Sequence, residues 1–140
     1  MVPQRRGRGT VKLHGRRKIP VLFQVTDYFG NLVALQEETW FTHILEPIEG
    51  HPRMLGYENL VQQTLQDPLE IRMAAYDTGA VFISDPGVGP SPEGIRAVVS
   101  YSTVAFEKGA CTGIVTTAYP IDLVRYPSPR MGRIIVSRRR

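Results

Sequence analysis

The stretch IRAVVSYSTVAF, from Ile95 to Phe106, decides the fold. Its first half is crowded with β-branched and apolar residues, which favour a β-strand too hydrophobic for the edge of a sheet. Three further runs have strand composition, and turn-forming residues separate all four: Glu70 to Tyr76, Ala80 to Ser84 and Cys111 to Tyr119. Four sequential strands with short links predict an antiparallel sheet with the Ile95 strand near its centre.

The chain before residue 69 predicts a hairpin and two short helices. Val21 to Tyr28 and Leu32 to Leu35 read as strands around the turn residues 29–31. Two apolar stripes at helical spacing follow, ended by prolines 47 and 68. Their members are Trp40, Phe41, Ile44 and Leu45 in the first helix, and Met54, Tyr57, Val61 and Leu65 in the second. The predicted fold is therefore α+β, with an N-terminal β-hairpin and two short helices packed on a four-stranded antiparallel sheet.

Charge is distributed unevenly along the 140 residues. Residues 1–18 hold seven basic residues and no acid, and residues 121–140 hold six basic residues and one acid. Residues 19–120 carry 4 basic and 12 acidic residues, a net charge of −8. We therefore predict a basic arm over 1–18 that is flexible and mostly without secondary structure, a single domain over 19–120, and a basic extension over 121–140. Such ends attract phosphate backbones, form solvated tails, or fold back onto the acidic body.

Composition and motifs exclude several classes of protein and site. No apolar run is long enough for a membrane-spanning helix, and the run from Ile19 to Val25 reads as a strand rather than a signal peptide. The single cysteine, Cys111, excludes an internal disulfide and a multi-thiolate zinc site. The glycines at 87, 89 and 94 do not match a nucleotide-phosphate loop. We expect no metal, no cofactor and no membrane partner.

The histidines at 43 and 51 are the most interesting titratable groups. His43 lies in the first predicted helix and His51 just before the second, so the connecting turn can bring both to one cleft at the sheet edge. Imidazole titrates near neutral pH and is suited to moving protons. The structural alternative is a packed or capping His43 and a loop residue His51.

Several short motifs, taken in order, resemble one family. They are DYFGNLVAL (27–35), W-x-x-H-I (40–44), His51-Pro52, YENLV (57–61), TLQDP (64–68), IRAVV (95–99) and GIVTTAYP (113–120). This order resembles small phage- and mobile-element-associated proteins that are grouped with barnase, EndoU, colicin and RelE in one nuclease superfamily. The resemblance covers residues 20–120 and implies two helices on a four-stranded antiparallel sheet.

The resemblance implies a toxin-type ribonuclease that needs no metal. A base takes the proton of a ribose 2′-hydroxyl, the oxygen attacks the adjacent phosphorus, and an acid protonates the leaving 5′-oxygen. On this basis His43 is the first choice for acid or base and His51 the second, while Thr117 and Tyr119 donate hydrogen bonds to phosphate. The alternative for Thr117 and Tyr119 is a packed strand end. Arg53, Ser84 and Trp40 are the predicted substrate-binding residues.

The chain departs from the family pattern in three places. Arg53 stands where such proteins generally carry glutamate after His-Pro, and Met73-Ala74-Ala75 offers no hydroxyl where they carry a serine. The strand at 81–84 has no lysine or arginine, and Ser84 is its only polar residue. Arg53, beside His51, is the local cation that the sequence offers, and the strand at 81–84 supplies none.

Three functions follow as hypotheses. A ribonuclease acts on RNA, with DNA as an alternative substrate, and has an immunity or antitoxin protein as a partner; it is cytoplasmic or delivered to a target cell. A non-catalytic nucleic-acid-binding or phage accessory protein retains RNA without turnover, with a steep salt dependence. A structural or oligomerising module shows neither property but has a concentration-dependent mass.

Overall fold

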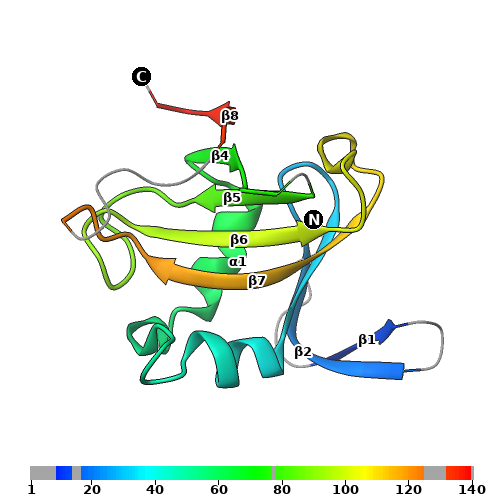
Figure 1. The fold of residues 1–140 in the computed structure, drawn as a ribbon, viewed down its shortest axis with the longest axis horizontal. Helices are drawn as coiled ribbons and strands as arrows, with labels where there is room; N and C mark the ends of the chain where they lie inside the picture. The colour runs from blue at the N-terminus through cyan, green and yellow to red at the C-terminus, as the bar shows by residue number, and fades with distance from the viewer. Residues whose placement is uncertain (1–8, 14–16, 77, 125–131, 140) are drawn as a thin grey trace.

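Eight strands form one mixed sheet in the computed structural model, which describes residues 9–13, 17–76, 78–124 and 132–139 (Figure 1). Their order across the sheet is β1-β2-β3-β7-β6-β5-β4-β8. The strands are β1 (Gly9–Leu13), β2 (Arg17–Thr26), β3 (Leu32–Gln36), β4 (Glu70–Met73), β5 (Gly79–Ile83), β6 (Ile95–Tyr101), β7 (Thr112–Pro120) and β8 (Ile134–Ser137). All neighbours pair antiparallel except β3 and β7, which are parallel.

One α-helix and three short helical turns accompany the sheet. The helix is α1 (Glu58–Gln66), and the turns are η1 (Thr39–Ile44), η2 (Pro52–Met54) and η3 (Phe106–Lys108). Val61 and Leu65, one turn apart on α1, are fully buried in the main core. Figure 1 shows α1 behind the central strands, and no described helix covers the face of the sheet turned toward the viewer. We call that face the open face.

The alternation of side chains in β6 separates the two faces. Ile95, Ala97 and Val99 belong to the main core under α1. Arg96 and Val98 alternate with them and therefore point to the open face. There Val98 packs with a small second cluster of buried residues, Val81, Ile83 and Ile121. A strand with apolar residues on both faces must lie inside the sheet, as predicted for the Ile95 strand.

A buried turn holds the parallel pair of strands together. The carboxylate of Asp27 accepts hydrogen bonds from the backbone N–H groups of Phe29 and Asn31, which closes the hairpin between β2 and β3. The side chain of Asn31 donates to the carbonyl of Phe106 and accepts from the N–H of Cys111 at 3.1 Å. The turn is thereby tied to the loop that enters β7, which sets the pairing of β3 with β7.

The predicted arrangement of elements is wrong. The strands at 70–76, 80–84, 95–106 and 111–119 are present as β4 to β7, but they lie inside an eight-stranded mixed sheet rather than a four-stranded antiparallel one. The first predicted helix is a six-residue π-helix in which the N–H of Leu45 donates to the carbonyl of Trp40. Only the second predicted helix contains α-helix, and Pro68 limits α1 to nine residues.

The composition of residues 1–18 predicts little secondary structure, yet β1 and the start of β2 lie there. Those residues cannot bury a face alone, and their backbones are paired with each other instead. The division at residues 18/19 and 120/121 stays a prediction. Within the described part of the chain, no helix has the length and apolar character needed to cross a membrane.

Candidate active site

Adjacent strands bring Arg96 and Tyr119 together on the open face. The two residues are a directly opposed pair of β6 and β7, and Val98 and Thr117 are the next such pair on that face. The guanidinium carbon of Arg96 lies 6.0 Å from the centre of the Tyr119 ring. This geometry places a cation against the face of a phenol ring.

A tight loop after η1 carries His51 to the same place. The backbone N–H of His51 donates to the carbonyl of Ile44 at 2.5 Å, and its carbonyl accepts from Met54 in η2 at 2.9 Å. Gly50 fits closely beneath this loop, since a Cβ there would lie 2.4 Å from the carbonyl oxygen of His43. The imidazole of His51 is thereby held 5.3 Å from the Tyr119 ring, centre to centre.

Of Arg96, Tyr119 and His51, Arg96 is the residue that the sequence did not predict. Its side chain belongs to a residue that is only 6% exposed, and its buried Nε has no hydrogen-bond partner among the described residues. An unpaired buried donor on a charged group is costly, so the position of Arg96 calls for an explanation. The sequence pattern looked for a strand cation at 81–84, whereas the structure has a buried arginine on the neighbouring strand, β6. A lone arginine within the apolar run IRAVV is the signal that identifies it.

These residues line one cavity of about 240 Å³. Its walls are residues 50–53 on one side and Arg96 with residues 119, 120 and 122 on the other. Arg53 is exposed and its guanidinium donates to the carbonyl of Pro90 in the Gly/Pro-rich loop 85–94. Three predicted site residues, His51, Arg53 and Tyr119, therefore meet in this cavity, together with Arg96 and Asp122.

The other predicted site residues lie elsewhere. Trp40 is 1% exposed in the main core, where it has no surface for a substrate. The hydroxyl of Ser84 accepts from the N–H of Ile95 at 2.8 Å and donates to the carbonyl of Asp85, which is a structural position. Thr117 lies on the open face one residue pair beyond Tyr119. His43 is exposed and is not among the residues that line the cavity.

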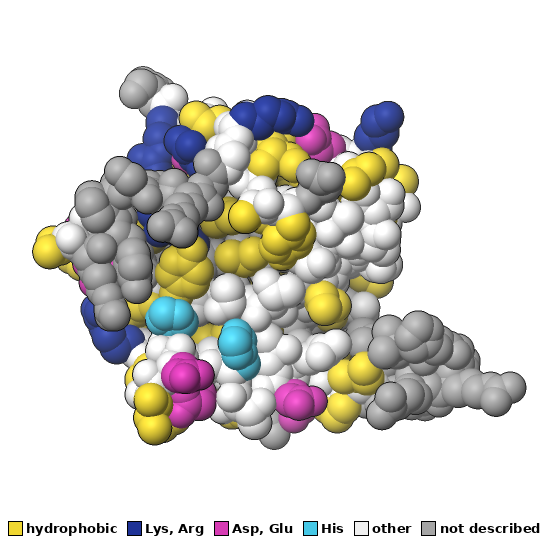
Figure 2. Space-filling view, in the orientation of Figure 1, with side chains coloured by type: hydrophobic (Ala, Val, Ile, Leu, Met, Phe, Trp, Pro, Cys, Tyr) yellow, Lys and Arg dark blue, Asp and Glu magenta, His cyan; other side chains and the backbone are white. Residues whose placement is uncertain are grey.

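Figure 2 shows the side chains of both described histidines on the same face of the molecule. Only His51 contributes to the cavity walls given above. No group of three or more His, Cys, Asp or Glu side chains in the described residues is arranged to hold a metal ion. The cavity thus offers an imidazole, a phenol, two guanidinium groups and the carboxylate of Asp122. The first two kinds of group suit proton transfer, and the guanidinium groups suit an anion.

A second polar cluster lies on the α1 side of the sheet and stabilises the fold. Asp27 is 5% exposed and accepts a hydrogen bond from the Tyr101 hydroxyl. Desolvation raises the pKa of Asp27, against the opposing effect of the hydrogen bonds from Tyr101 and from the turn backbone. Burial and the Asp27 charge raise the pKa of Tyr101, so its hydroxyl stays protonated and remains the donor. Tyr101 also stacks on Phe106, with ring centres 4.6 Å apart.

Comparison with known proteins gives no relative from which the site could be interpreted. No protein-family model, no curated protein and no solved structure matches this chain.

Proposed function

We propose that the chain is a ribonuclease that cleaves RNA without a metal ion, at the cavity between the His51 loop and strands β6 and β7. The observation that carries the proposal is the meeting of His51, Tyr119 and the buried Arg96 in one cavity. Cleavage through the 2′-hydroxyl needs a proton acceptor, a proton donor and a cation for the phosphate, and these three side chains supply those groups.

In the proposed reaction His51 accepts the proton of the 2′-hydroxyl. The 2′-oxygen forms a bond to phosphorus, and the bond from phosphorus to the 5′-oxygen breaks, which leaves a 2′,3′-cyclic phosphate and a 5′-hydroxyl. Arg96 binds the non-bridging oxygens, whose negative charge it balances. Tyr119 donates a proton toward the leaving 5′-oxygen. Arg53 stands at the exposed rim and attracts the flanking phosphate.

This proposal gives the central role to His51 rather than to His43. Both histidines are candidates from the sequence, but His51 lies against Tyr119 and lines the cavity. The resemblance to the nuclease superfamily supports the proposal through the His51-Pro52 and T-A-Y motifs, which contribute His51 and Tyr119. The glutamate and serine that such proteins carry are replaced by Arg53 and Met73-Ala74-Ala75. These replacements favour a non-catalytic RNA-binding protein as the second candidate.

The deciding experiment incubates the full chain with end-labelled, mixed-sequence RNA in excess EDTA. An otherwise identical strand with 2′-deoxyribose at every position tests the role of the 2′-hydroxyl. We expect cleavage of the all-ribose strand only, about 100-fold slower in His51→Ala. His43→Ala is expected to retain more activity than His51→Ala.

The possible results separate the candidates. If His43→Ala loses activity and His51→Ala does not, the assignment of the catalytic histidine is wrong. If the folded wild-type protein binds the RNA but leaves it intact, the second candidate replaces the first. Cleavage of the deoxy strand would contradict attack by the 2′-hydroxyl.

A further inference from the structure

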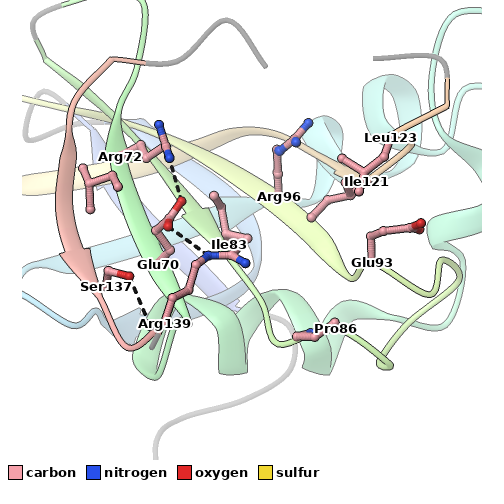
Figure 3. Close-up of a pocket in the computed structure, with 11 residues that line it drawn as sticks. Glu70, Arg72, Ile83, Pro86, Glu93, Arg96, Ile121, Leu123, Ser137 and Arg139 are labelled. Atoms are coloured by element: carbon pink, nitrogen blue, oxygen red, sulfur yellow. Dashed lines mark hydrogen bonds and ion pairs between the residues drawn. The ribbon is translucent and has the colours of Figure 1, made fainter. Parts of the chain in front are cut away.

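A larger cavity of about 630 Å³ lies beside the proposed active site on the open face (Figure 3). Arg96 lines both cavities and is therefore the wall that they share. The walls of the larger cavity include the aliphatic side chains of Ile83, Ile121, Leu123 and Ile134. Together they offer a non-aromatic apolar surface next to the guanidinium that the proposed function assigns to the scissile phosphate.

Charged groups on the far side of this cavity form an ion-paired triad. The two oxygens of Glu70 accept from Arg72 Nε at 2.7 Å and from Arg139 Nε at 2.9 Å. Figure 3 shows both arginines reaching toward this one carboxylate, with Arg96 and Leu123 across the cavity. Because Glu70 is 3% exposed and takes both guanidinium groups, two positive charges stand against one negative charge there.

The cavity as a whole is positive within an acidic body. Its lining contains three arginines, at 72, 96 and 139, and two glutamates, at 70 and 93, so the sum is 3 − 2, or +1. Residues 19–120 have a net charge of −8. A positive, partly apolar hollow on such a body favours a ligand that is anionic and also has a flat or hydrophobic part.

We propose that the larger cavity is a second nucleotide subsite, so that single-stranded RNA crosses the open face from Tyr119 toward Glu70. This inference rests on the proposed function. The phosphate to be cleaved lies at Arg96, the adjoining nucleoside packs on the aliphatic surface, and the next phosphate faces Arg72 and Arg139. The substrate is then an unpaired strand of at least two linked nucleotides, because the bases of a duplex are not free to enter a pocket.

The dimensions of the sheet fit this path. Tyr119, Arg96, Ile83 and Glu70 are successive opposed residues of β7, β6, β5 and β4. Neighbouring strands are about 4.8 Å apart, so the row spans about 14 Å. That length accommodates a nucleoside together with the phosphates on its two sides.

Binding of a strand that cannot be cut tests the subsite apart from catalysis. Wild-type protein is titrated with a mixed-sequence tetranucleotide that has 2′-deoxyribose at every position, and NMR follows two sets of signals. The methyl groups of Leu123 and Ile134 report the larger cavity, and the ring of His51 reports the smaller one. We expect both sets to shift with one dissociation constant.

A pair of adjacent substitutions supplies the control. Leu123 lines the larger cavity and Val124, its 95% exposed neighbour, lines neither. Leu123→Glu places a carboxylate where the proposal places a nucleotide, and we expect affinity to fall at least about tenfold, which corresponds to 1.4 kcal/mol. Val124→Glu makes the same change in net charge and is expected to alter affinity less than about twofold.

Each outcome has a distinct meaning. Shifts at His51 without shifts at Leu123 and Ile134 would overturn the second subsite and leave the proposed function standing. Equal losses in Leu123→Glu and Val124→Glu would overturn it as well, because net charge alone would then explain them. A strand that shifts neither set of signals would overturn the subsite, whereas the proposed function is decided separately by cleavage of the all-ribose strand. Shifts in the larger cavity alone would overturn the continuous path through Arg96.

Discussion

Burial of Arg96 lowers the stability of the fold, and the proposed function gives a reason for keeping it. Its Nε is buried without a hydrogen-bond partner among the described residues, whereas Arg72 on the same face is paired with Glu70. A buried donor that lacks a partner costs about 1 to 3 kcal/mol. The two arginines should therefore respond in opposite ways to replacement by an apolar side chain of similar length.

We expect Arg96→Met to raise the melting temperature by about 2 to 5 °C, since the unpaired donor is removed. The same variant should cleave RNA about 100-fold more slowly, because the phosphate loses its cation. Arg72→Met is the control for stability and should lower the melting temperature, because it leaves the buried Glu70 with one partner fewer. Calorimetry and the EDTA cleavage assay measure both effects. A lower melting temperature in Arg96→Met would show that Arg96 stabilises the fold.

Asp27 makes stability depend on pH through its buried carboxyl group. Burial raises its pKa above the value of about 3.9 found in unfolded chains. Its contribution to stability is then fully present below that value and is lost as the pH rises through the folded-state pKa. Asn at this position keeps an oxygen that can accept from the N–H groups of Phe29 and Asn31 but has no charge.

We therefore expect the stability of the wild type, relative to Asp27→Asn, to decline as the pH rises from about 4 toward 7. Urea unfolding of both proteins across this range measures the difference. A relative stability of the wild type that increases over the same range would mean that the hydrogen bonds to Asp27 outweigh its desolvation.

The candidate site could be predicted in part from single residues. His51, Arg53 and Tyr119 stand in recognisable short motifs, so the sequence pattern singles them out. Arg96 is not in such a motif, and its importance appears only when β6 pairs with β7 and turns it toward Tyr119. The prediction that Trp40 binds substrate is wrong because Trp40 is buried in the core. Its place in an apolar stripe already favoured burial.

At the scale of elements, local sequence patterns predict the central strands. They do not predict which strands pair when the partners are far apart in the chain. The strands β4 to β7 have enough apolar and β-branched residues to be recognised one by one. The parallel pairing of β3 with β7 depends on Asn31 reaching residues about 75 positions away in the chain. No periodicity in the sequence records such a contact, so the predicted sheet was too small.

The loop before η2 is the element that positions the proposed base. A Cβ added at Gly50 would lie 2.4 to 2.7 Å from the carbonyl oxygens of residues 43, 44 and 46. These oxygens belong to the backbone and cannot rotate away, so an alanine must displace the loop that carries His51. Gly56, after η2, has nothing within 4 Å of an added Cβ and has a φ of +88°.

We expect Gly50→Ala to reduce RNA cleavage more than tenfold and to cost about 1 to 3 kcal/mol of stability, as overpacking does. Gly56→Ala is the matched control: its strained φ should cost about 1 kcal/mol while cleavage stays close to that of the wild type. Cleavage rates and urea unfolding of the two variants are compared. Full activity in Gly50→Ala would show that the position of His51 is not critical.

At the scale of the whole molecule, the described arginines of the basic C-terminal end are already paired with the acidic body. Arg133 contacts Glu107 at 3.3 Å, and Arg138 contacts Asp85 at 3.2 Å and Asp67 at 3.9 Å. These described arginines fold back onto carboxylates, which matches one of the three roles expected for the charged ends. Surface pairs of this kind add little to stability, but they reduce the positive charge offered to a distant phosphate. Long-range attraction of the proposed RNA substrate is then left to basic residues outside these pairs, and residues 1–18 hold seven of them.

This division of charge predicts different salt dependences for two matched double variants. Arg5→Gln with Arg6→Gln should reduce the slope of log affinity against log salt by about 1.4 for an uncleavable 12-nucleotide strand, since each lost phosphate contact on a single strand is worth about 0.7. Arg133→Gln with Arg138→Gln removes the same charge but frees carboxylates already paired, so its slope should stay near that of the wild type. Fluorescence anisotropy at several salt concentrations measures the slopes. If the two variants change the slope equally, the ion pairs of Arg133 and Arg138 do not shield their charge, and attraction follows net charge alone.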